Sequence, residues 1–282
     1  MVNLRWALKR TAKWSVECAS AISGYGLAYQ RSRAFVEGFR ILTYHRIAER
    51  PRDSHTVKTD HFRNHMSFLA DHHPVIGLGE LAQRLVNGPV PEKGSIAVTF
   101  DDGYSEAATI VSEILDQHKI PATFFIITGL LDKEIQFPGG PFLTWEGVGQ
   151  MAAAGFSIGS HAVSHQSLGG MSPKEAELEL VNSYRRIAEE LGLPPTGVAY
   201  PYGTMRDFSA VIARIAQKAG YNYAVTAVHG LNHMGCDPFY LRRTSLTAGD
   251  GPRTFRMILK GHLDSWRFVD RWGYRLQRVN AS

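Results

Sequence analysis

Val98-Thr-Phe-Asp-Asp-Gly-Tyr104 is the stretch that decides the fold, because an apolar, β-branched run ends there in two carboxylates and a glycine. Residues 95–100 (Ser-Ile-Ala-Val-Thr-Phe) have the composition of a buried parallel strand. In α/β barrels the active site lies at the carboxyl ends of the strands. The stretch therefore predicts a buried strand that delivers Asp101 and Asp102 to a site.

A second short strand is predicted at residues 156–160, and it ends at His161, with His165 four residues further on. Two neutral imidazoles and one carboxylate leave a fourth position open for water, which is typical of catalytic zinc. A shared cation also explains how two adjacent carboxylates are tolerated, and the second carboxylate is free to act as a base. The pattern indicates a metal hydrolase for amides or esters; the alternative is an ordinary Asp-Asp-Gly turn with solvated histidines.

Two other histidine pairs have the same spacing, and neither brings an acid with it. His61 and His65 lie in a predicted helix whose apolar stripe is Phe62, Met66 and Leu69, and the pattern puts both histidines off that stripe. His229 and His233 lie in a loop after residues 223–228. We interpret both pairs as solvated or structural.

Strand candidates alternate with helical patterns along most of the chain, which favours a parallel sheet. The clearest helix starts at the capping box Ser172-Pro-Lys-Glu175, carries Leu180, Tyr184, Ile187 and Leu191 on one face, and ends at Gly192. A length of 282 residues with 44% hydrophobic content suits one large α/β domain. The predicted strands are 40–45, 74–78, 95–100, 122–128, 156–160, 197–200, 221–227 and 240–246.

Together with Ser160-His-x-x-x-His165 and Ala199-Tyr-Pro-Tyr-Gly203, the Asp-Asp-Gly stretch resembles the polysaccharide deacetylase (NodB-like) family, from about Ile41 to Leu246. The resemblance implies a distorted, incomplete (β/α) barrel of about seven strands in a single domain. It also implies removal of N-acetyl groups from a sugar in a polysaccharide or lipid-linked saccharide, as in exopolysaccharide biosynthesis. By the same resemblance Asp101 is the general base, Asp102, His161 and His165 hold a divalent metal, most simply Zn²⁺, and Pro201 and Tyr202 wall the substrate groove.

The chain departs from the family pattern at two places. Many members carry an arginine just before Pro-Tyr-Gly that orients the base, whereas residues 197–201 read Gly-Val-Ala-Tyr-Pro; Arg242 or Arg243 is the candidate replacement. Many members also supply an acid histidine near the end of the domain, and residues 245–250 contain none. His45, which follows the strand Ile41-Leu-Thr-Tyr44, resembles the Tyr-His motif of one branch and is predicted to protonate the leaving amine, with a structural role as the alternative.

In the implied mechanism a metal acidifies water and polarises the acetyl carbonyl, and Asp101 takes the proton. Backbone N–H groups after Asp102, such as that of Tyr104, are candidates to hold the oxyanion. Two alternatives stay open at this point. One is a metal-dependent amidohydrolase that acts on a small cyclic amide, and the other is a carbohydrate-binding pseudoenzyme, which the missing arginine permits.

The ends of the chain are basic. Residues 1–40 and 253–282 each carry a net charge of +5, which leaves −5 for residues 41–252. The two basic ends also contain Trp6, Trp14, Trp266 and Trp272. Basic residues mixed with tryptophan suit peripheral contact with an anionic membrane; the alternative is helices that pack tryptophan onto the barrel. No nucleic-acid-binding module is recognised. We predict a basic helical segment at 1–38, a catalytic barrel at 39–250 and a basic helical extension at 251–282.

The N-terminal segment lacks a convincing export signal, since Glu17 interrupts its apolar part. Cys18 and Cys236 form no disulfide framework, which fits a reducing compartment. The expected location is therefore the cytoplasm, at the inner face of the membrane.

Overall fold

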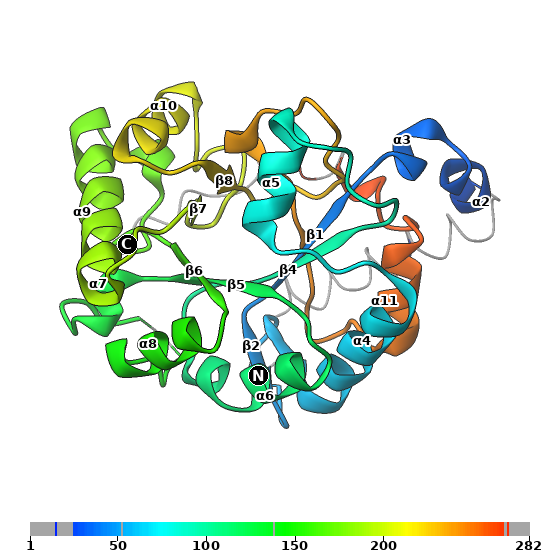
Figure 1. Cartoon of the computed structure of the whole chain (residues 1–282), viewed down its shortest axis with the longest axis horizontal. Helices are drawn as coiled ribbons and strands as arrows, with labels where there is room; N and C mark the ends of the chain where they lie inside the picture. The colour runs from blue at the N-terminus through cyan, green and yellow to red at the C-terminus, as the bar shows by residue number, and fades with distance from the viewer. Residues whose placement is uncertain (1–14, 16–24, 52, 138, 268–269, 271–282) are drawn as a thin grey trace.

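Seven parallel strands form a curled sheet with the order β8-β7-β6-β5-β4-β1-β9 in the computed structural model (Figure 1). The structure describes Ser15 and residues 25–51, 53–137, 139–267 and 270. The predicted incomplete (β/α) barrel in a single domain is therefore confirmed. The strands are β1 (Arg40–Tyr44), β4 (Ile96–Phe100), β5 (Ala122–Ile126), β6 (Ser157–Ser160), β7 (Gly197–Ala199), β8 (Tyr223–Val225) and β9 (Thr244–Ser245), with a separate pair, β2 (Arg46–Ala48) and β3 (Thr56–Lys58).

Helices surround the outer face of the sheet (Figure 1). The α-helices are α2 (Tyr25–Gln30), α3 (Arg33–Val36), α4 (Thr59–His72), α5 (Leu78–Asn87), α6 (Ile110–Gln117), α7 (Thr128–Leu131), α8 (Trp145–Ala153), α9 (Pro173–Leu191), α10 (Ala210–Ala219) and α11 (Pro252–Leu259). Short 3₁₀ turns are η1 (Ser105–Ala108), η2 (Leu168–Gly170) and η3 (Pro238–Tyr240). None of these described helices is long and apolar enough to cross a membrane.

Alternate residues of the strands face opposite sides, as a pleated strand requires. On β1 and β4, Leu42 and Val98 pack outward in the main hydrophobic core. Ile41 and Ala97 face inward and pack in a second cluster with the apolar side of α5. The same alternation turns Thr99 inward, where its hydroxyl lies 2.6 Å from that of Thr43. The barrel interior is thus apolar beside α5 and polar toward the carboxyl ends of the strands.

Helix α9 confirms the capping-box prediction. The Ser172 side chain accepts a hydrogen bond from the N–H of Glu175, and the helix ends at Gly192, which is left-handed with φ of 69°. Leu180 and Ile187 of the predicted face are fully buried. Both ends of α9, the longest described helix, were predictable because each is set by the local capping residues.

Two predicted strands are wrong in part. Residues 74–78 form only an isolated bridge, Val75 with Ile96, because α5 begins at Leu78. In residues 240–246 the strand shrinks to Thr244–Ser245, because the chain crosses a gap: Leu241 bridges to Val225 of β8, whereas Thr244 pairs with Leu42 of β1. This crossing spans the seam of the incomplete barrel. The β2–β3 pair was not predicted.

Helix α4 corrects the prediction for His65, which lies on the buried face with Phe62, Met66 and Leu69 and is fully buried. Its Nδ1 lies 3.1 Å from the Tyr44 hydroxyl, and its ring stacks on Phe255 at 4.0 Å. The histidine is structural, as the broader interpretation held, but it is not solvated.

The ends of the chain are described only in part. Trp266 packs in the main core and is 6% exposed. This tryptophan therefore packs onto the barrel, which is the alternative to membrane contact. Trp6, Trp14, Trp272 and Cys18 lie outside the described residues, as does most of the segment 1–38. The membrane contact, the cytoplasmic location and the three-part division of the chain stay predictions.

Candidate active site

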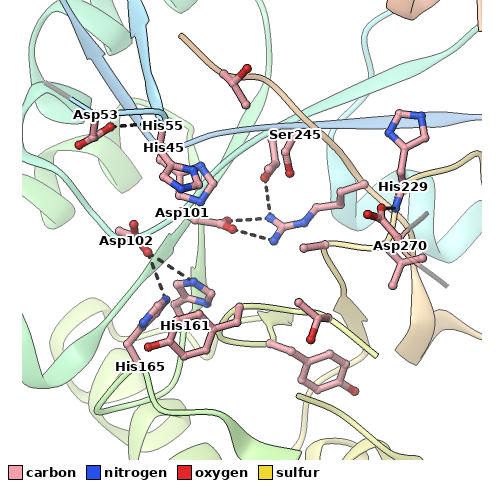
Figure 2. Close-up of a pocket in the computed structure, with 18 of the residues that line it drawn as sticks. His45, Asp53, His55, Asp101, Asp102, His161, His165, His229, Ser245 and Asp270 are labelled. Atoms are coloured by element: carbon pink, nitrogen blue, oxygen red, sulfur yellow. Dashed lines mark hydrogen bonds and ion pairs between the residues drawn. The ribbon is translucent and has the colours of Figure 1, made fainter. Parts of the chain in front are cut away.

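The carboxyl ends of the strands open into a cavity of about 380 Å³ (Figure 2). His45, Asp101 and His161 are the residues that directly follow β1, β4 and β6, so the parallel sheet brings them together. The predicted residues that line the cavity are His45, Asp101, Asp102, Tyr104, His161, His165, Tyr202 and Arg243. Of the predicted set, only Pro201 and Arg242 are not among the lining residues.

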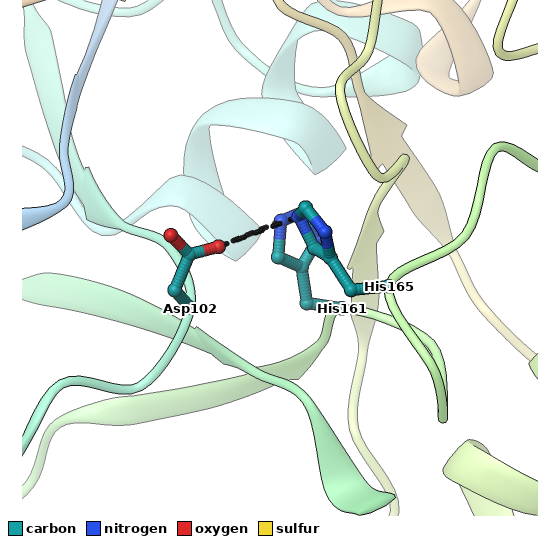
Figure 3. Close-up of side chains that lie close together, drawn as sticks. All are labelled: Asp102, His161 and His165. Carbon is teal, nitrogen blue, oxygen red and sulfur yellow. Dashed lines mark ion pairs between the residues drawn. The ribbon is translucent and has the colours of Figure 1, made fainter. Parts of the chain in front are cut away.

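Asp102, His161 and His165 form a compact group whose potential ligand atoms all lie within 4.8 Å of one another (Figure 3). Asp102 Oδ1 lies 3.5 Å from His161 Nε2 and 3.4 Å from His165 Nε2. His161 Nδ1 lies 2.8 Å from the carbonyl oxygen of Ala199 and must donate to it, which leaves the Nε2 lone pair free for a ligand. The three potential ligand atoms are therefore close enough together to hold one metal ion.

The electrostatics of this group also fit a cation. Burial, with the charge of Asp101, raises the pKa of Asp102 to about 8, and Asp102 Oδ1 has no hydrogen-bond partner among the described residues. Burial lowers the pKa of His161, and burial with the neighbouring His161 lowers that of His165 to about 2. The two imidazoles are neutral and can offer lone pairs, and the Asp102 carboxyl is costly to ionise unless a cation is nearby. A divalent ion would therefore be well accommodated between these three side chains.

Asp101 has a different partner. Arg243 donates to both of its carboxylate oxygens, at 2.7 and 2.6 Å, and both side chains are buried. Burial acts to raise the pKa of Asp101, but the Arg243 guanidinium outweighs it and holds that pKa well below its usual value. The structure thus distinguishes Arg243 from Arg242, which is exposed. Of the two candidates, Arg243 is therefore the one that contacts Asp101.

Arg243 is held from three sides. Its Nη1 also donates to the Thr43 hydroxyl at 2.7 Å, and its Nε donates to the carbonyl of Thr226 at 2.9 Å. These partners lie on β1 and after β8, on either side of the seam that residues 241–245 cross. Such an arginine is rigid, so it fixes the orientation of the Asp101 carboxylate.

His45 lies beside a histidine that the sequence interpretation missed. The rings of His45 and His55 are 4.8 Å apart, and both line the cavity. Asp53 Oδ1 accepts hydrogen bonds from the His55 N–H and the Thr56 hydroxyl, which fixes the turn that carries His55. Burial and the neighbouring His55 lower the pKa of His45 to about 3, so His45 is neutral in this state. An available signal was the polar Asp53-Ser-His55 loop shortly after the strand that ends at His45.

Three residues around the site have left-handed backbone conformations, which are uncommon for residues other than glycine. They are Asp102 with φ of 71°, His165 with φ of 57° and Tyr202 with φ of 59°. Such conformations cost free energy and concentrate at functional sites. At Asp102 the turn lets two consecutive carboxylates meet different partners, Arg243 for one and the two histidines for the other.

The rim is aromatic. Tyr202 is 56% exposed, and its ring lies 4.8 Å from that of His165, so it walls the cavity as expected. Pro201 is buried behind it. Phe137, which was not predicted, also contacts His165, with the two ring centroids 4.8 Å apart. Tyr104 is only 8% exposed and lies under the Arg46 guanidinium, 4.1 Å from its ring centroid.

His229 and His233 do not belong to the catalytic group. His233 is exposed, whereas His229 is buried with Nε2 3.1 Å from Asp264 Oδ1. The statement that no acid accompanies this pair is therefore wrong, because Asp264 comes from the segment after α11. His229 is a structural histidine at the edge of the cavity.

Comparisons with known proteins agree with this geometry. The model of the family described as polysaccharide deacetylase matches residues 88–224. A Bacillus subtilis (strain 168) protein that carries the name polysaccharide deacetylase YxkH is 27% identical over 74% of this chain and 71% of its own length. Peptidoglycan-N-acetylglucosamine deacetylase PgdA of Listeria monocytogenes is 31% identical over 44% of this chain, and the match spans only 24% of that protein.

Among solved structures, Streptococcus pyogenes deacetylase PplD in complex with acetate has the same fold, with a TM-score of 0.70 over 79% of this chain and 98% of that one, at 23% identity. The family match begins before β4 and ends within β8, so it includes Asp101, Asp102, His161 and His165. Residues 88–224 thus match the polysaccharide deacetylase family, and the described chain has the fold of a solved deacetylase.

Proposed function

We propose that the protein is a metal-dependent hydrolase that removes N-acetyl groups from an N-acetylated saccharide. The observation that carries the proposal is the division of labour between two adjacent carboxylates. Asp101 is paired with Arg243 and stays ionised, whereas Asp102 faces two neutral histidines. One carboxylate is thereby available as a proton acceptor and the other as a ligand. The match of residues 88–224 to the polysaccharide deacetylase family supports the saccharide as substrate.

Asp102, His161 and His165 would hold the ion, and their two nitrogens and one oxygen suit Zn²⁺. A divalent ion bound there would polarise an acetyl carbonyl and acidify a water molecule. The remaining chemistry falls to the protein's own side chains.

Asp101 accepts the proton of the attacking water. Its two hydrogen bonds to Arg243 hold the carboxylate in one orientation, and its lowered pKa keeps it ionised at neutral pH. Arg243 is itself fixed by Thr43 and Thr226, so the base does not have to reorganise during the reaction. The family's base-orienting arginine thus has a functional replacement from a different part of the chain, which removes the reason for a pseudoenzyme.

His45 protonates the leaving amine. At rest it is neutral, so this role requires that its pKa rise once substrate is bound. Negative charge that develops on the attacked carbonyl acts in that direction, since an anion nearby favours the imidazolium. Tyr202 and Phe137 both contact the His165 ring and line the cavity, so they offer aromatic surface against which a sugar ring can pack.

The experiment is an acetate-release assay on N-acetylglucosamine oligomers, N-acetylated polymers and lipid-linked saccharides. Protein loaded with Zn²⁺ should release acetate from at least one class, and protein treated with a chelator should not. Asp101→Asn, loaded in the same way, is the matched control for contaminating activity. Release at the same rate from Asp101→Asn and the unaltered protein, or from none of the substrates, would overturn the proposal.

A further inference from the structure

The cavity is lined by more negative than positive charge. Its described acidic lining residues are Asp53, Asp101, Asp102 and Asp270, whereas Arg243 is the single lysine or arginine among the described lining residues. The charge of Arg243 is already balanced by Asp101, to which it donates two hydrogen bonds. A bound divalent ion would more than offset Asp102 and leave one positive charge at the metal site, so Asp53 and Asp270 are the acids that the rest of a saccharide meets away from the metal.

Among the described residues, Asp53 has a cationic partner and Asp270 has none. Asp53 lies 3.5 Å from the Arg46 guanidinium, whereas no lysine or arginine of the described residues forms an ion pair with Asp270. Asp270 Oδ2 accepts a hydrogen bond of 2.9 Å from the N–H of His229. Figure 2 shows Asp53 and Asp270 on opposite sides of the cavity, with Asp101 between them.

The segment that carries Asp270 is anchored beside the seam of the barrel. Asp264 accepts two hydrogen bonds from Arg40 of β1, both at 2.9 Å, and contacts His229 beyond β8. All three side chains are buried. A buried, bidentate ion pair with a further hydrogen bond holds its elements in a fixed relation. The hydrogen bond from the N–H of His229, the same residue that contacts Asp264, in turn holds the Asp270 carboxylate at the cavity edge.

We propose that Asp270 makes the site selective for saccharides that carry a free, protonated amine beside the acetamido unit. The inference rests on the proposed function, whose product is such an amine. A glucosamine ammonium next to the reacting unit would be attracted to Asp270, whereas a lactyl carboxylate or a phosphate would be repelled. The enzyme would therefore prefer a partly deacetylated chain over a fully acetylated one, and both over an acidic one.

The test uses three trisaccharides with a central N-acetylglucosamine. The flanking units are glucosamine, N-acetylglucosamine or muramic acid N-acetylated at its amine, so the flanks are cationic, neutral or anionic. Acetate released from the central unit, located by mass spectrometry, gives kcat/KM for each. In the unaltered protein the order should be cationic, neutral, anionic, and 0.5 M NaCl should compress the differences because salt screens partly exposed charges.

Asp270→Asn keeps an oxygen that can accept from His229 and removes only the charge. It should lower the cationic-to-neutral ratio about fivefold, the scale of one ion pair in a partly exposed site. Asp116→Asn, on the exposed side of α6, is the matched control and should leave the ratio unchanged. An unchanged ratio in Asp270→Asn, or a preference for the anionic chain, would overturn the inference.

Calorimetric binding of the same three saccharides to both variants separates the two proposals. If no trisaccharide releases acetate, the proposed function fails for these substrates. The inference is then decided by the dissociation constants alone, whose order must follow the charge of the flanking units in the unaltered protein and lose that dependence in Asp270→Asn.

Discussion

Arg243 donates hydrogen bonds to both carboxylate oxygens of Asp101, at 2.7 and 2.6 Å, although the two residues are 142 positions apart in the sequence. The segment that carries Arg243 crosses from the edge of β8 to the edge of β1. The same arginine side chain therefore links the strands on the two sides of the seam and orients the proposed base.

Arg243→Lys should lower kcat on the order of 10²-fold, because lysine keeps the charge but cannot hold both oxygens, and a misplaced reacting group costs about that much. Arg243 lowers the pKa of Asp101, so a weaker partner lets that pKa rise. The base acts when ionised, above its pKa, and the acid limb of kcat/KM should shift to higher pH. Arg242→Lys, at an exposed position, is the control. An unmoved acid limb with unchanged kcat would exclude the orienting role.

Asp101→Asn and Asp102→Asn should separate base from ligand. The first should retain about the metal content of the unaltered protein and lose turnover by about 10²–10⁴-fold, since it removes only the proton acceptor. The second should lose metal along with activity. Elemental analysis of gently purified protein, with His161→Ala as a third variant, measures the metal. Metal loss in Asp101→Asn with activity surviving in Asp102→Asn would mean that the two roles are reversed.

Metal binding at neutral pH should release about one proton. Without an ion the pKa of Asp102 is about 8, so its carboxyl is mostly protonated at pH 7 and must ionise to become a ligand. The histidines are already neutral at that pH and contribute none. Titration of Zn²⁺ into chelator-treated protein, by calorimetry in buffers of different ionisation enthalpy, counts the protons. Asp101→Asn should release fewer, because the Asp101 charge, which adds to burial in raising the Asp102 pKa, is gone; equal release from Asp101→Asn and the unaltered protein would contradict Asp102 as the source of the proton.

His45→Ala should retain fold and metal but lower kcat strongly on a sugar acetamide, whose amine leaving group needs a proton. On an activated acetate ester the loss should be much smaller, because that leaving group departs unprotonated. His233→Ala, at an exposed loop position, is the control for the loss of a histidine. Equal losses on both substrates would point to a structural role for His45, and a large loss in His233→Ala or His229→Ala would move the acid to the loop.

Acid should destabilise the protein partly through His65. Burial lowers the pKa of this side chain to about 3, against about 6.5 when unfolded. Between those values the unfolded chain binds a proton that the folded chain does not, so the free energy of unfolding falls as pH falls, by up to about 1.4 kcal/mol per pH unit. Urea unfolding of chelator-treated protein at pH 7 and pH 4 should show a smaller decrease for His65→Gln. The exposed His233→Gln should match the unaltered protein; an identical decrease in His65→Gln would refute the assignment.

The sequence by itself determined the strands that carry the site and the residues at their ends. β-Branched runs that stop at carboxylates or imidazoles, as at Phe100 and Ser160, contain their own boundaries. Once parallel strands pair in register, residues at their carboxyl ends must meet. The meeting of the two aspartates with His161 and His165, and the helix α9, were predictable for this reason, since strand composition and helix capping are local properties. The choice of Asp102 over Asp101 as the ligand came from the family resemblance.

Only the tertiary structure decided which polar side chains pair across the barrel. Arg243 and Arg242 are indistinguishable as neighbours in sequence, and the crossing of the seam turned one toward Asp101 and the other to solvent. The sequence pattern put His65 off the apolar stripe of its helix, yet the Tyr44 hydroxyl on β1 reaches its Nδ1 and allows burial. A buried polar group is tolerated only if a partner reaches it, and that partner comes from a distant part of the chain.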